Sequence, residues 1–68
     1  MKLHYYAETD SLYIELRDAP SVETREVAEG VLVDLDGDGK VVGFDIDGAS
    51  GKIDLGRVDV EALPLRVA

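Results

Sequence analysis

The feature that most constrains this chain is residues 30–47, GVLVDLDGDGKVVGFDID, in which two apolar-alternating arms flank an Asp-Gly turn. Such alternation around Asp-Gly is typical of a β-hairpin. With Asp38 and Gly39 as the turn residues, the predicted cross-strand pairs are Leu35 with Val42, Val33 with Phe44 and Val31 with Ile46. A slip of one residue would turn one arm's apolar set away from the core, so the pattern specifies this register.

Residues 2–6 and 12–17 predict a second hairpin, because both alternate and residues 7–10 form a polar loop between them. The predicted apolar pairs are Tyr5 with Leu12 and Leu3 with Ile14; the predicted pairs on the other face are His4 with Tyr13 and Lys2 with Glu15. Residues 24–27 predict a short third strand, and its charged side chains favour a place at the edge of the sheet.

The C-terminal segment is ambiguous. Ile53 and Leu55 alternate as in a strand, whereas Asp59 is a suitable N-cap for a turn of helix over residues 60–63. In either form, its apolar residues are expected to close the sheet's apolar face: Ile53, Leu55, Val58, Leu63 and Leu65. The sequence therefore predicts one mainly β domain over residues 1–68, a small twisted antiparallel sheet of two hairpins and four to five strands.

Size and charge restrict the partners. A chain of 68 residues without cysteine is near the lower limit for folding alone, so association with a second copy or another protein is expected. The net charge of −8 argues against direct nucleic-acid binding and would attract a basic protein partner, although solubility alone is the favoured explanation of the acidity. Neither a signal-peptide stretch nor a membrane-length apolar run is evident, so we expect a cytoplasmic protein with no membrane partner.

A set of short motifs carries a family resemblance: Tyr5-Tyr6, DSLYIEL at 10–16, Glu26-Val27, VDLD at 33–36, GKVVGFDI at 39–46 and Ala49-Ser50. Together they resemble the YuzE-like family of small bacterial proteins, a domain of unknown function. The resemblance covers roughly residues 4–50 and implies no catalytic residues and no cofactor. Some members are similar to antitoxin-like partners encoded beside small toxins, which implies a binding or structural module.

One motif points to metal. Asp34, Asp36, Asp38 and Asp45 fall at positions 1, 3, 5 and 12 of a calcium-loop pattern whose position 6 is Gly39. The flanking segments read as strands rather than helices, and Asp45 stands where a bidentate Glu is usual. The context therefore favours an acidic hairpin turn, and we assign no metal site, with these four aspartates as the candidates if a cation binds.

Two further arrangements bear on catalysis. Asp34 and Asp45 are predicted as diagonal neighbours on the hairpin's outer face, where paired carboxylates divide acid and base roles only if their pKa values differ. His4, the only histidine, is expected beside Tyr6 and Tyr13, with Ser11 further along the face. A solvated charged face and an outward packing histidine are the favoured interpretations.

Three hypotheses of function follow. The first is a non-catalytic protein-interaction module, an antitoxin-like partner of a small basic protein. The second is a homo-oligomeric domain that binds a cation or small ligand weakly on its acidic face. The third, which the residues favour least, is a hydrolase-type enzyme that uses His4.

Overall fold

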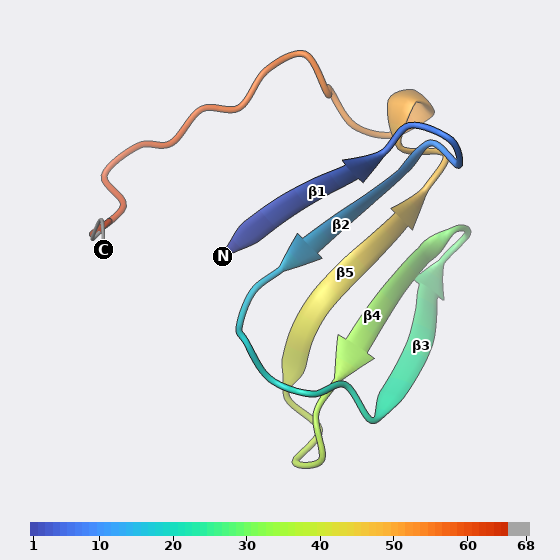
Figure 1. Cartoon of the computed structure of the whole chain (residues 1–68), viewed down its shortest axis with the longest axis vertical. Helices are drawn as coiled ribbons and strands as arrows, with labels where there is room; N and C mark the ends of the chain where they lie inside the picture. Colours follow the sequence, from blue (N-terminus) through green and yellow to red (C-terminus); the bar gives the residue numbers. More distant parts are fainter. Residues whose placement is uncertain (66–68) are drawn as a thin grey trace.

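A computed structural model describes residues 1–65 and places five strands in one antiparallel sheet (Figure 1). The elements are β1 (Lys2–Tyr6), β2 (Ser11–Glu15), β3 (Glu23–Ala28), β4 (Val31–Leu35), β5 (Val41–Asp47) and the 3-10 turn η1 (Ala49–Gly51). The spatial order is β1-β2-β5-β4-β3, with β5 in the centre. The prediction of a mainly β fold is confirmed; the last three residues of the predicted 1–68 domain lie outside the described residues.

The first hairpin has the predicted register. Tyr5 pairs with Leu12, Leu3 with Ile14, His4 with Tyr13 and Lys2 with Glu15. The loop between the strands is residues 7–10, and Asp10 closes it with a positive φ of 52°. Aspartate tolerates this left-handed conformation better than most residues, so the loop sequence and the register agree.

The main hairpin has the predicted pairs Val33–Phe44 and Val31–Ile46, but the predicted pair Leu35–Val42 is wrong. Asp36 N–H donates to Lys40 O at 2.8 Å and Gly39 N–H donates to Asp36 O at 3.0 Å, so the loop has three residues, 37–39, instead of two. Leu35 consequently pairs with Val41. Val42 of β5 is an extra residue with no partner on β4, which makes a β-bulge. Because of this bulge, the pairs from Gly43 onward are again the predicted ones.

The sheet has one apolar face. Four of its side chains are buried, Leu12, Val33, Leu35 and Val42, and Ala49 of η1 is buried beside the sheet. Five further apolar side chains are only half-buried: Ile14, Leu16, Val31, Phe44 and Ile46. The two edge strands β1 and β3 are exposed along their whole length. The predicted edge position of the third strand is therefore confirmed, with the strand two residues longer than 24–27.

The C-terminal segment forms neither of the alternatives considered for it, because residues 54–65 contain no strand and no helix. A single isolated turn gains few hydrogen bonds for the residues that it orders, so the 60–63 turn lacks a driving force. Ile53 is half-buried over the sheet, but Val58 and Leu65 are 70 % and 69 % exposed. Closure of the apolar face is thus confined to the start of the segment, and its end runs away from the strands as an extended arm, residues 60–65 (Figure 1).

Within residues 1–65, no helix has the length and apolar character that crossing a membrane requires.

Candidate functional site

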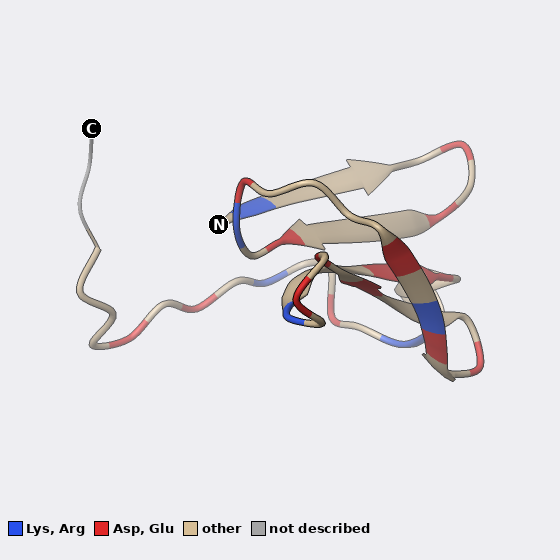
Figure 2. Ribbon diagram, turned by 90° about the horizontal axis from the view of Figure 1, so that it is seen from below, with Lys and Arg blue, Asp and Glu red and all other residues tan. Residues whose placement is uncertain are grey.

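The face of the sheet opposite the apolar one carries an acidic patch around Tyr13. Tyr13 pairs with Asp45 across β2 and β5, and Ser11 pairs with Asp47. Four carboxylates make up this patch, which we call the acidic face: Glu15, Asp34, Asp45 and Asp47. Figure 2 shows that acidic positions outnumber basic ones on the strands. Each carboxylate stands at a fixed strand position, so the negative charge is displayed on a rigid surface.

Tyr13 and Asp34 form a side-chain link across the sheet. The Tyr13 hydroxyl donates to Asp34 Oδ2 at 2.8 Å, and the Thr24 hydroxyl donates to Asp34 Oδ1 at 2.6 Å. The link joins β2, β4 and β3 by passing over Gly43 of β5, where a Cβ atom would lie 2.6 Å from the Tyr13 hydroxyl. Asp34 therefore already accepts a hydrogen bond at each of its two oxygens.

The electrostatics of the acidic face follow from this crowding. The hydrogen bond to Asp34, together with burial and the neighbouring carboxylates, raises the pKa of Tyr13 to about 12. Burial and repulsion from Asp47 and Asp34 raise the pKa of Asp45 above its ordinary value. The predicted neighbourhood of Asp34 and Asp45 is confirmed, and the raised pKa of Asp45 shows that the folded sheet disfavours negative charge at this position.

The four candidate calcium ligands do not converge. The Asp36 carboxylate holds the hairpin turn: its Oδ1 accepts from the backbone N–H groups of Asp38 and Lys40, both at 2.9 Å. Its Oδ2 accepts from Arg17 at 2.5 Å. Asp34 is engaged on the sheet, and residues 1–65 contain no group of three or more potential ligands positioned to hold a metal ion.

His4 has the neighbours that the sequence predicted. It pairs with Tyr13 across β1 and β2, and its ring lies tilted against that of Tyr6, with centroids 4.3 Å apart. His4 is exposed on an edge strand. This arrangement is the outward packing role favoured by the sequence.

A second polar cluster ties the first hairpin to η1. The Asp10 carboxylate accepts from the Tyr5 hydroxyl at 2.8 Å and from the Ser50 hydroxyl at 2.7 Å. Asp10 O also accepts from Ala49 N–H at 2.8 Å. Hydrogen bonds from Ser50 and Tyr5 lower the pKa of Asp10. Sequence reasoning assigned Asp10 only to its turn, because a partner 40 residues away leaves no local signal.

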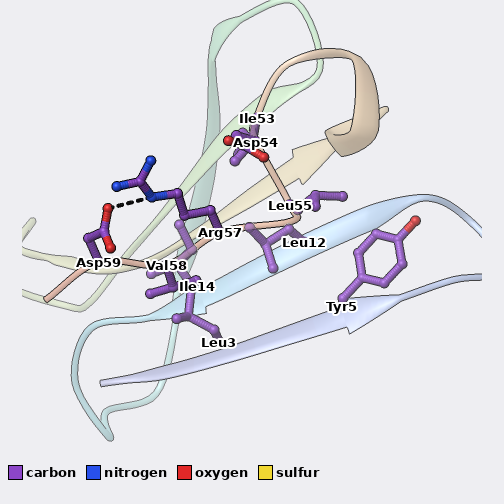
Figure 3. A pocket seen from close by; sticks show the side chains of 10 residues that line it. All are labelled: Leu3, Tyr5, Leu12, Ile14, Ile53, Asp54, Leu55, Arg57, Val58 and Asp59. Atoms are coloured by element: carbon purple, nitrogen blue, oxygen red, sulfur yellow. Dashed lines mark ion pairs between the residues drawn. The ribbon is translucent and has the colours of Figure 1, made fainter.

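An apolar groove of about 620 Å³ lies on the opposite face, between the sheet and the C-terminal segment (Figure 3). Its floor is formed by Leu3, Tyr5, Leu12 and Ile14 of β1 and β2. Its wall is formed by residues of the segment after η1: Ile53, Asp54, Leu55, Arg57, Val58 and Asp59. Arg57 Nε and Asp59 Oδ2 form an ion pair at 2.7 Å, so these two charges offset one another at the groove's end.

Comparison with known proteins gives one positive result. Neither the curated proteins nor the solved structures include a match to this chain. A family model, described as a protein of unknown function (DUF2283), matches residues 2–50, which is most of the chain and includes all five strands. The chain therefore belongs to the DUF2283 family.

Proposed function

We propose that this protein is a non-catalytic interaction module that binds a small basic protein through its acidic face. The observation that carries the proposal is the grouping of Asp45 with Asp34 and Asp47 on one face of the sheet, where burial and repulsion from the other two raise the pKa of Asp45. A Lys or Arg of a partner beside Asp45 would offset the repulsion among the three carboxylates. Binding would thus remove an unfavourable interaction that the free protein already has.

Two further features support the same partner chemistry. The net charge of −8 would attract a basic protein over long range and speed the encounter. Hydrogen bonds from Tyr13 and Thr24 hold Asp34 in one orientation, so less side-chain freedom is lost on binding. The finer resemblance to YuzE-like proteins, some of which are antitoxin-like, points to a partner encoded by a neighbouring gene.

The competing cation site has less support. The Arg17 guanidinium already lies against the Asp36 carboxylate, so a cation at this position would meet its positive charge. The hydrolase hypothesis rests on His4, whose ring packs against Tyr6. The proposed function uses neither a cation at Asp36 nor catalysis by His4, and the protein performs no turnover of its own.

The experiment is an affinity capture from the source organism with three baits. The first is the wild-type chain. The second is Asp45→Asn/Asp47→Asn, in which the amide introduced at position 47 keeps an oxygen that can accept from Ser11. The third is Asp38→Asn/Glu29→Gln, which removes the same charge from two turns away from the acidic face. Each capture is performed at low and at high salt, and the bound proteins are identified by mass spectrometry.

The expected result is a basic protein that wild type and the turn variant retain at low salt, and that the Asp45/Asp47 variant loses. High salt should release it from every bait, because the distance over which exposed charges interact falls from about 10 Å at 0.1 M salt to about 3 Å at 1 M. An acidic or neutral partner, or equal retention by both variants, would contradict the assignment of the acidic face.

A further inference from the structure

The protein exposes more surface than its size requires. Its accessible area is 5369 Å². A compact monomer of 7.4 kDa exposes about 4,200 Å² by the usual scaling of surface with mass. The excess of about 1,200 Å² exceeds the roughly 800 Å² that each partner buries in a standard protein–protein interface. The surplus area is thus of the size that a stable dimer removes from water.

Apolar side chains at the groove and on the arm contribute to this exposed area. Leu3 and Tyr5 of the groove floor are 49 % and 44 % exposed. Val58 of the groove wall is also exposed, as are Val60, Leu63 and Leu65 of the arm. Stable domains pack a second layer on the apolar face of a sheet. Within residues 1–65, the only element outside the sheet is the short turn η1, so the sheet lacks such a layer.

We propose that a second copy of this chain supplies that layer. The two copies pack with their apolar faces together, and the arm of each, residues 60–65, lies in the groove of the other. Each arm fills the groove of the other copy, so the two contacts are related by a two-fold axis. No further copy can then be added, and the assembly is a closed dimer. Val60, Leu63 and Leu65, which do not line the groove of their own copy, become buried against the partner.

The distribution of charge permits this arrangement. Glu15, Asp34, Asp45 and Asp47 point to the opposite side of the sheet, so in the dimer they face outward and away from the other copy. The charged residues of the groove lining are Asp54, Arg57 and Asp59, two of which form an ion pair. Arg25 and Glu23 of β3 also form an ion pair. Among the described residues, the acidic ones that the interface brings in without an ion-pair partner are therefore Asp54 of the groove wall and Glu61 of the arm, few for a chain with an overall charge of −8.

The test is sedimentation equilibrium of the full purified chain at several concentrations. The arm variant is Val60→Asp/Leu65→Asp, which alters side chains that are 61 % and 69 % exposed in one copy and so leaves its fold intact. The groove variant is Leu3→Asp. The control is Val22→Asp/Val27→Asp, which alters side chains of similar exposure next to and within β3, at the other end of the sheet.

Wild type and the control should sediment at twice the chain mass at micromolar concentration. The arm and groove variants should raise the dimer dissociation constant about a hundredfold or more, because they bury an unpaired carboxylate. Circular dichroism should show the arm variant still folded. A monomeric wild type, a monomeric control, or a dimeric arm variant would overturn the proposal. The result is independent of the proposed function, because the purified chain contains no other protein and the acidic face is unaltered.

Discussion

The hydroxyl of Tyr13 lies 2.8 Å from Asp34 Oδ2, although the central strand β5 separates their strands. The contact requires glycine at position 43, since any Cβ there would meet the Tyr13 hydroxyl at 2.6 Å and Ile14 O at 2.7 Å. A small residue in the middle of the sheet thus allows one long side chain to connect three strands. The link holds the centre of the acidic face in place.

We expect Tyr13→Phe to lower the free energy of unfolding by about 1–2 kcal/mol, because Asp34 loses a hydrogen bond to its charged form. The pKa of Tyr13 rises from 10.0 to about 12 on folding, so its stabilisation is complete below pH 10 and is lost as the pH rises to 12. Urea unfolding at pH 8 and at pH 12 measures both effects. The pKa of Tyr5 is also raised, so Tyr5 still contributes to the pH dependence of stability in the variant. A pH dependence identical to that of wild type would contradict the role of Tyr13.

Gly43→Ala should destabilise the fold by about 1–3 kcal/mol, the usual cost of overpacking. The double variant Gly43→Ala/Tyr13→Phe should not recover this loss, because the clash with Ile14 O involves backbone and remains. Thermal unfolding of both variants checks the prediction. Gly37→Ala is a suitable control, since no heavy atom lies within 4 Å of a Cβ at that position.

The two hairpins and most of their register could be predicted because alternation and turn chemistry are local. The polar loop of residues 7–10, which ends at Asp10, was sufficient to predict the register of the first hairpin. The prediction for the main hairpin failed only next to its turn, where the Asp36 carboxylate binds the N–H groups of Asp38 and Lys40 and adds a residue to the loop. The extra Val42 compensates, because its side chain is buried on the apolar face and the later pairs regain their predicted partners.

The candidate site was less predictable because its contacts join distant parts of the chain. The proximity of Asp34 and Asp45 follows from hairpin register, but the Tyr13 link depends on β2 lying next to β5, which no local pattern specifies. Gly43 in the middle of a predicted strand was the available signal, because such a glycine often marks a close approach of another group. Likewise, the apolar residues of the arm resemble core positions in the sequence, although the described chain leaves them exposed.

Arg17→Gln should raise the pKa of Asp36 from about 2 toward its ordinary value of 3.8, since the Arg17 hydrogen bond is the largest cause of the shift. A lowered pKa stabilises the fold above pH 3.8, and this stabilisation is lost as the pH falls toward 2. The stability difference between wild type and Arg17→Gln should therefore be present at pH 6 and vanish near pH 2. Carboxyl NMR titration and urea unfolding test the two statements separately.

Calcium should bind no more tightly than in the millimolar range, because the described residues hold no group of three or more ligands placed for a metal ion and Arg17 already neutralises Asp36. Isothermal titration with calcium chloride measures this directly. Micromolar binding that Asp36→Asn abolishes would contradict the acidic-turn interpretation. Asp18→Asn, outside the hairpin, is the matched control.

Asp45→Asn should make the protein more stable at neutral pH. Burial and repulsion from Asp47 and Asp34 raise the pKa of Asp45 on folding, so the folded state disfavours its ionised form. A neutral side chain removes this penalty, and we expect a gain of about 0.5 kcal/mol, the scale of partly screened surface charges.

The stabilisation by Asp45→Asn should depend on pH. Because folding raises the pKa of Asp45, the wild-type side chain is neutral in the folded protein below about pH 3.8 and carries no penalty there. The penalty appears as the pH rises through the pKa of the folded state. The advantage of Asp45→Asn should therefore disappear below about pH 3.8. The melting temperature should rise by about 2–4 °C at pH 7 and be unchanged at pH 3. Asp38→Asn removes the same charge from the turn and should change neither value. A gain at pH 3 equal to that at pH 7 would mean that packing, and not charge, explains the difference.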